Sequence, residues 1–480
     1  MSLRPAHGVL ALALALAALY LPLLQTPSPT LVAVAQPPPF PLASVSARID
    51  HALFDDAPAV PHAESFALLA IAALLTGLLS RRLGANGWQA LFASALIGLH
   101  PASIEAVARL SARGDLLALD FSLGALLLVQ RPRLPALIGA TLCAALALLS
   151  SPVALALAPL VLVITLTAPG APVGLARVAW FLVLTPVGLV VATWSMTDWK
   201  PLHAAGVLGR LAVQTAWPRA VVPHLPSPGV LELVLGGLLV AATLVAFLAR
   251  GPVLLRFALG WLLAASLPVL GLWPLVAPLS SVHALLPLVG LAVAARAFST
   301  SAHAALALVL TLALGAWSFH VERAWEDDVH LGEANVAAFP DLPAAHHAWG
   351  LALADVMNGS ARTEFETAAR LAAEQHDDAT LTAAELVLGQ LSLAGAPDAA
   401  EAHLRRARST PAGLASPEVA VLLARSLAAQ QREVDALTVL EEQWSRTPAP
   451  ALAKLGDELA RRSADEDQQR VWDSRMRSVR

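Results

Sequence analysis

The residues best suited to chemistry lie between His100 and Asp115, inside a long hydrophobic region. This stretch, HPASIEAVARLSARGD, holds one His, two acids and two arginines in sixteen residues. Each charged group costs about 2.5–3.5 kcal/mol at the centre of a membrane helix, so such groups normally line a watery cavity or an interface. We expect Glu105 or Asp115 to hold a substrate hydroxyl, and the forked donors of Arg113 suit a phosphate oxygen. A polar loop with paired charges is the alternative.

The composition divides the chain into two parts. Hydrophobic residues make up 57% of the chain and charged residues 14%, against roughly 25% charged in an average soluble domain. Leu, Ala and Val runs dominate up to about residue 320, and Glu, Asp, Arg and Gln are frequent from Val321 onward. This predicts an all-α protein with a membrane domain at 1–320 and a soluble helical domain at 321–480. The net charge of −4 indicates no nucleic-acid partner, and the lone Cys143 excludes an intramolecular disulfide.

About eleven apolar segments are long enough, or nearly so, to cross a hydrocarbon core of about 30 Å. We predict these spans near residues 8–24, 64–80, 88–108, 115–129, 134–149, 151–168, 177–194, 229–249, 254–272, 281–298 and 302–319. The segment 203–223 is a candidate interfacial helix. Ala33-Val34-Ala35 before Gln36 looks like a signal-peptidase site, so cleavage after the first span is an open alternative.

The basic residues predict the orientation of these spans. With the N-terminus inside, nine arginines share the cytoplasmic side, namely Arg4, Arg81, Arg82, Arg131, Arg133, Arg177, Arg250, Arg256 and Arg296. The acids before residue 320 then lie on or near the outer face, and an odd number of spans delivers the C-terminal domain there as well. We therefore expect a multi-pass protein of a bacterial inner membrane, with a cytoplasmic N-terminus and domain 321–480 outside.

The residue order of the opening stretch resembles a family signature, HP-x-x-x-EAVAW-x-x-x-R-x-D-L. This signature is typical of the polytopic, TPR-bearing protein O-mannosyltransferases, which belong to the GT-C class of glycosyltransferases. The resemblance implies a GT-C-like bundle that takes a sugar from a polyprenyl-phosphate donor, with a divalent metal if the protein is active. Carried onto this sequence, it makes Asp115 and Glu105 the catalytic candidates and His100 and Arg113 the substrate-binding candidates.

The family also carries an acidic pair shortly after the first span, whose carboxylate acts as catalytic base and metal contact. Here the segment from Leu21 to Phe40 contains no acid. Asp55 and Asp56 form an acidic pair further along the chain. They are candidates for a relocated, substrate-binding pair, and a solvated turn before Pro58 is the alternative.

A second segment resembles a family motif but lacks the two residues to which the family owes its function. The segment 148–155 keeps the apolar frame of the family's LLSKE-x-A-L, but Ser151 replaces the Lys and Pro152 replaces the Glu. The family's Lys would neutralise the lipid-phosphate leaving group, a role that needs a cation. Serine cannot supply this charge. Arg109, in addition, occupies the Trp position of the opening signature.

A third motif, AERYLYLP in the family, corresponds to the segment 279–287. Ser281, Val282 and His283 replace its Glu, Arg and Tyr. A membrane-buried His can mark function, and a packed or interfacial His is the alternative. The family's acid, Lys and second Arg are therefore all missing, which favours loss or rebuilding of the family's catalysis.

The tail after residue 320 shows a repeating helical pattern. Trp325-Glu326-Asp327-Asp328 matches the family's junction before its repeats, and paired helical patterns start near residues 342, 378, 416 and 450. This spacing of 34–38 residues is close to the TPR period. We predict an α-solenoid of TPR-like hairpins, with a generic array of helical hairpins as the alternative. Either array offers a surface for an extended peptide or a partner protein.

Two functions follow from this sequence. One is a membrane glycosyltransferase that uses a lipid-linked sugar and an acceptor held by the tail. The other is a binding or scaffolding protein that keeps the fold without its catalysis. The charges in the outer cavity discriminate between them, because transfer needs a base for the acceptor hydroxyl and a cation for the leaving phosphate. Asp115 and Arg113 are the local pair that could attempt both.

Overall fold

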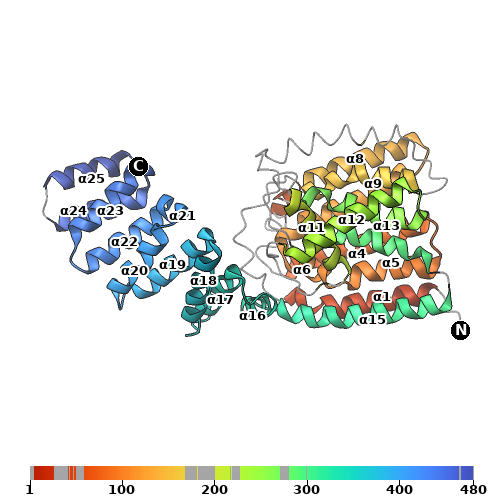
Figure 1. Ribbon diagram of the computed structural model, residues 1–480, viewed down its shortest axis with the longest axis horizontal. Helices are drawn as coiled ribbons and strands as arrows, with labels where there is room; N and C mark the ends of the chain where they lie inside the picture. Colours follow the sequence, from red (N-terminus) through yellow and green to blue (C-terminus); the bar gives the residue numbers. More distant parts are fainter. Residues whose placement is uncertain are drawn as a thin grey trace. The chain divides into compact units, whose positions relative to one another are not determined.

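The computed structural model describes residues 5–25, 42, 44–46, 48–49, 59–167, 181, 201–216, 218, 228–270, 280–298, 300–463 and 466–478. These residues form helices and turns, with no strand among them, so the predicted all-helical class is confirmed for them. The chain divides into two compact units, Met1–Leu331 and Gly332–Arg480 (Figure 1). Residue 320, where we predicted the domain boundary, lies inside the continuous helix Ser301–Ala324 of the first unit.

Unit 1 is a bundle of apolar helices with short 3-10 turns at their ends. Its elements are α1 (Pro5–Tyr20), η1 (Pro22–Gln25), α4 (Ala59–Arg82), α5 (Gly87–Leu99), α6 (Ala102–Ala108), η2 (Leu110–Ala112), α7 (Arg113–Val129), α8 (Leu134–Ser150), η3 (Pro152–Ala156), α9 (Leu157–Thr167), α11 (Pro201–Ala216), α12 (Val230–Leu248), α13 (Val253–Ser266), η4 (Leu267–Val269), η5 (Ser281–Ala284), α14 (Leu285–Ala294), η6 (Ala295–Ala297) and α15 (Ser301–Ala324). The first and last helices, α1 and α15, pack side by side (Figure 1).

Three of these helices are long and apolar enough to cross a membrane. They are Val60–Arg82, Val230–Leu248 and Ser301–Ala324, and the bent pair α5 and α6 makes a fourth span if it is counted as one. Five further apolar helices are 10–17 residues long, shorter than the roughly 20 residues of a typical span. The predicted span 115–129 lies within α7, which is not among these apolar helices. The predicted span 177–194 lies mostly outside the described residues.

The helix that carries the candidate residues is broken at His100 and Pro101. The axes of α5 and α6 differ by 57°. Pro101 has no N–H to continue the helix, and the N–H of Ala102 turns to His100 Nδ1 at 3.2 Å. The N–H of Ser103 bonds the His100 carbonyl at 2.9 Å. The imidazole of His100 therefore stabilises the bend from within.

The break leaves three successive carbonyls of α5 without their normal partners four residues later. Each accepts a hydrogen bond from a buried hydroxyl, because an unsatisfied carbonyl inside an apolar bundle is costly. The pairs are Ser103 to Ile97 (2.6 Å), Tyr20 to Gly98 (3.0 Å) and Ser318 to Leu99 (2.7 Å). These bonds tie α1, α6 and α15 to one point and fix the direction of α6.

Unit 2 is a succession of helix pairs. Its helices are α16 (Asp328–Ala338, which begins in unit 1), α17 (Pro343–Asp355), α18 (Ala361–Gln375), α19 (Asp378–Ser392), α20 (Pro397–Arg408), α21 (Pro411–Ala415), α22 (Pro417–Ala429), α23 (Glu433–Arg446), α24 (Pro450–Arg462) and α25 (Glu466–Ser478). Four pairs pack internally, α17 with α18, α19 with α20, α22 with α23 and α24 with α25. The first helices of these pairs start at Pro343, Asp378, Pro417 and Pro450.

Glycines allow the two helices of three pairs to approach closely. In each case a glycine on the first helix faces a large buried side chain on the second, and a Cβ there would clash with it. The contacts are Gly350 with Phe365, Gly389 with Leu404 and Gly456 with Trp472. These side chains are all almost fully buried. The glycines therefore set the helix spacing within each pair.

Candidate functional site

The predicted residues gather at one end of unit 1, which we name the site end and define by Glu105, Arg113 and Asp115. Glu105 lies on α6 and is fully buried. Its Oε1 lies 3.0 Å from Arg109 Nη2, and its Oε2 accepts the N–H of Val282 at 3.2 Å. A buried carboxylate needs such partners to remain charged. Glu105 thus attaches α6 to the turn η5.

Arg109 connects this carboxylate to η5 a second time. Its Nη2 donates to Ser280 Oγ at 3.0 Å, and its side chain is only 12% exposed. The guanidinium therefore lies between Glu105 and Ser280. Arg109 was not among the predicted site residues, yet its position four residues after Glu105 is the spacing of a helical ion pair. This spacing could have predicted the ion pair from the sequence.

Asp115 lies in the first turn of α7 and is half-buried. Its Oδ1 accepts a hydrogen bond from Ser151 Oγ at 2.6 Å. The structure thus brings Ser151 of the segment 148–155 into contact with the candidate acid Asp115. The charges of Asp115 and Arg109 both act on the ring of His283.

His283 is held in one orientation. Its Nδ1 accepts the N–H of Ser280 at 3.1 Å, so Nε2 must carry the ring proton whenever the imidazole is neutral. We name Asp115, His283, Arg109 and Ser151 the site cluster. In it Ser151 donates to Asp115, and His283 and Arg109 both contact Ser280. Carboxylates and imidazoles are groups that can take a proton from a hydroxyl.

Arg113 belongs to a separate group of contacts. Its Nη1 lies 3.0 Å from Glu64 Oε2 and donates to Ser46 Oγ at 3.2 Å, and its Nη2 donates to the Pro61 carbonyl at 3.3 Å. Ser46 Oγ in turn donates to Glu64 Oε1 at 3.0 Å. The Arg113 side chain is 5% exposed. Its guanidinium connects the start of α7 to the start of α4, and sequence analysis did not foresee its partner Glu64.

His100 is 1% exposed and packed at the bend between α5 and α6. A second buried imidazole, His62 on α4, contacts the Val107 carbonyl through Nδ1 at 3.0 Å. His62 was not predicted, and no motif in the sequence marked it. Asp55 and Asp56 lie outside the described residues, so the structure does not place this predicted pair.

A divalent metal does not fit the acidic residues that the structure places at the site end. Metal sites there would need a convergent set of carboxylates or imidazoles. Glu105 is bound by Arg109, and Asp115 is bound by Ser151. Within the described part of the chain, no three His, Cys, Asp or Glu side chains converge.

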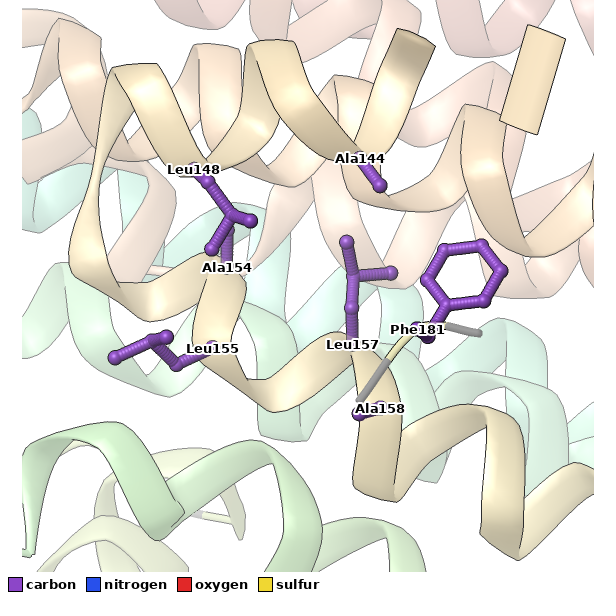
Figure 2. Close-up of a pocket in the computed structure, with 7 residues that line it drawn as sticks. All are labelled: Ala144, Leu148, Ala154, Leu155, Leu157, Ala158 and Phe181. Atoms are coloured by element: carbon purple, nitrogen blue, oxygen red, sulfur yellow. The ribbon is translucent and has the colours of Figure 1, made fainter. Parts of the chain in front are cut away.

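A small apolar pocket lies next to Ser151, between α8, η3 and α9 (Figure 2). It encloses about 200 Å³, part of which is open to the surroundings, and is lined by Ala144, Leu148, Ala154, Leu155, Leu157, Ala158 and Phe181. No polar side chain lines it. The side chains that line the pocket include no group that could take part in a reaction.

Comparison with known proteins gives this chain no relative, since no family model, no curated protein and no solved structure matches it.

Proposed function

We propose that this protein is a membrane scaffold related to the polyprenyl-phosphate-sugar-dependent protein O-glycosyltransferases and has lost their catalysis. In this proposal unit 1 is a GT-C-like bundle with about eleven spans, a cytoplasmic N-terminus and an outward site end. Unit 2 is a TPR-like domain on the outer side that binds a protein or an extended peptide. The helix lengths support membrane insertion, and the sequence motifs support the relationship.

The observation that carries the proposal is the pairing of both arginines at the site end. Arg113 is paired with Glu64, and Arg109 is paired with Glu105. Transfer from a lipid phosphate needs positive charge that is available to the leaving group. A guanidinium that is already neutralised by a carboxylate supplies little of it. Ser151, in the family's Lys position, donates to Asp115 instead.

The repeated geometry of unit 2 supports the TPR-like part of the proposal. Helix pairs start close to the residues that the sequence period predicts. Gly350, Gly389 and Gly456 take the same place in three first helices, against Phe365, Leu404 and Trp472. Stacked helix pairs present an extended surface. Such a surface suits an acceptor peptide in an active transferase and a partner protein in a scaffold.

An active transferase is the second candidate, and one observation favours it. Asp115 and His283 are close enough at the site end for the charge of Asp115 to act on the imidazole, and His283 is oriented by the Ser280 backbone. In this reading Asp115 accepts the proton of a Ser or Thr hydroxyl, directly or through His283, while Arg109 leaves Glu105 to face the donor phosphate. The sugar then passes from the phosphate oxygen to the acceptor oxygen, and the polyprenyl phosphate leaves as an anion.

Binding of a polyprenyl-phosphate mannose to the purified full-length protein tests the proposal. We expect the wild type to bind this donor weakly and the Ser151→Lys/Pro152→Glu variant to bind it about tenfold more tightly, since a cation returns beside Asp115. Pro152→Glu alone is the matched control and should give no gain. If the wild type already binds tightly and the double variant binds no better, another cation serves the phosphate and the proposal is wrong.

A further inference from the structure

Four exposed arginines lie at the end of unit 1 opposite the site end. Arg81 and Arg82 end α4, and Arg131 and Arg133 flank the turn between α7 and α8. We name this set the arginine pairs. None of these four takes part in an ion pair with a carboxylate of the described residues. They also play no part in the site cluster.

The Glu64–Arg113 ion pair indicates that Arg82 and Arg131 lie at similar distances along the bundle from the site end. It aligns the starts of α4 and α7, which pack against each other. Arg82 lies 18 residues beyond Glu64, and Arg131 lies 18 residues beyond Arg113. At 1.5 Å per residue both are about 27 Å from the ion pair, close to the roughly 30 Å of a hydrocarbon core. Neighbouring helix axes are about 8–10 Å apart, so the pairs are neighbours.

Each pair lies at the end of an exposed apolar stripe. On α4 the stripe is Ile71, Leu74 and Leu78, at helical spacing that continues to Arg81. On α8 the stripe is Leu134, Ile138 and Leu142, directly after Arg133. Leu134 is 70% exposed and Leu74 is 60% exposed. Acyl chains that lie along these stripes would bring their phosphates to the arginines.

Among the residues that the structure describes at this end, no acid competes for these charges. The segments 79–90, 127–137, 248–256 and 294–298 contain no Asp or Glu. Arg296 also lies at this end, because it donates to the Leu83 carbonyl at 2.6 Å. Its guanidinium is held by this hydrogen bond and by the face of the Phe257 ring. Charges within about a Debye length of one another combine to attract an anionic headgroup.

We propose that the arginine pairs bind the headgroup of an anionic phospholipid of the cardiolipin class, with one phosphate on each pair. Two arginines on each of two adjacent helix ends match two phosphodiesters on one short linker. Arginine suits this role because its forked donors bind phosphate oxygens bidentately. The binding lies at the opposite end from the site cluster and does not depend on the function proposed above.

Native mass spectrometry of the full-length protein in detergent, titrated with cardiolipin, tests this site. Arg81→Gln/Arg82→Gln and Arg131→Gln/Arg133→Gln should each weaken cardiolipin binding about 30-fold, since a basic residue near a membrane surface contributes about 1 kcal/mol. Arg131→Lys/Arg133→Lys should weaken binding less than Arg131→Gln/Arg133→Gln, because lysine keeps the charge but lacks the forked donors. Phosphatidylcholine binding should be the same in all variants.

Arg250→Gln is the control for diffuse surface charge. Arg250 is exposed and lies just before α13. The other end of α13 continues into η4, which packs on η3 at the site end. Arg250 therefore lies at the same end as the arginine pairs. Arg250→Gln should leave the cardiolipin affinity unchanged, whereas Arg133→Gln alone should weaken it. Equal effects of these two single variants would overturn the proposal. So would a wild-type affinity for cardiolipin that is independent of salt, a measurement that needs no variant to fold.

Discussion

At the scale of single residues, the ion pair of Glu105 and Arg109 serves structure before chemistry. Glu105 is fully buried and depends on Arg109, Val282 and the neighbouring turn for its charge. Removing one member of a buried pair leaves the other charge without compensation, which costs far more than the pair contributes. The candidate catalytic acid Glu105 thus connects α6 to η5. Asp115, the other candidate, is partly exposed.

Arg109→Ala should therefore destabilise unit 1 by about 3–5 kcal/mol, because Glu105 would remain buried and unpaired. The double variant Arg109→Ala/Glu105→Ala should recover a large part of this loss. Thermal unfolding of the purified protein in detergent, run as a double-mutant cycle, measures the coupling. Full stability of Arg109→Ala together with lost binding of a lipid phosphate would instead make Arg109 a ligand-binding residue.

The sequence predicted some of these contacts and could not predict others. The Glu105–Arg109 pair follows from helical spacing alone. The Arg113–Glu64 pair joins residues on separate helices, so it depends on how α4 and α7 align, which no local pattern encodes. The contact of Ser151 with Asp115 likewise needs the α7–α8 hairpin to close. Asp55 and Asp56 stay predictions.

At the scale of elements, the repeat period of unit 2 predicted where helices start, whereas the length of an apolar run in unit 1 did not predict one continuous helix. The starts of the helix pairs in unit 2 lie within a residue of the predicted positions, because apolar spacing and small residues repeat there. In unit 1 the residues 88–108 were predicted as one span, but Pro101 divides them into α5 and α6. The hydroxyls that stabilise this bend come from α1, α6 and α15, and their convergence was not visible in the sequence.

The glycines of unit 2 give an element-scale prediction. Gly456→Ala should destabilise the pair α24–α25 by about 1–3 kcal/mol, since its Cβ would overlap the Trp472 ring and overpacked cores must distort. Hydrogen–deuterium exchange of the full-length protein should show reduced protection in both helices. Gly359→Ala, where the space around the glycine is open, is the control. Equal loss of protection in the two variants would contradict the packing role.

At the scale of the whole molecule, the distribution of charge separates the two ends of unit 1. Among the described residues, the pairs Glu105–Arg109 and Glu64–Arg113 lie at the site end, and the arginine pairs at the other end have no neighbouring acid in segments 79–90 and 127–137. Membrane proteins retain such arginines on the cytoplasmic side. The helix lengths support membrane insertion of unit 1. The proposed orientation follows from the arginines and not from the helix lengths.

Reporter fusions test this orientation. A reporter that is active only outside the cytoplasm should be active when fused after Arg480 and silent when fused after Arg82. A cytoplasm-specific reporter at the same two positions should give the opposite pattern, which controls for expression. An active external reporter after Arg82 would place the arginine pairs outside and would contradict the proposed outward orientation of the site end.

Release of sugar from a labelled polyprenyl-phosphate mannose is the most direct measurement of lost catalysis. The full-length protein, reconstituted in lipid with Ser- and Thr-containing peptides, should release no more label than its Asp115→Asn variant. The reason is that the arginines at the site end are paired with carboxylates and Ser151 supplies no cation to the leaving phosphate. Release that increases with time in the wild type and disappears in Asp115→Asn would contradict this, and would identify the protein as an active transferase with Asp115 as its base.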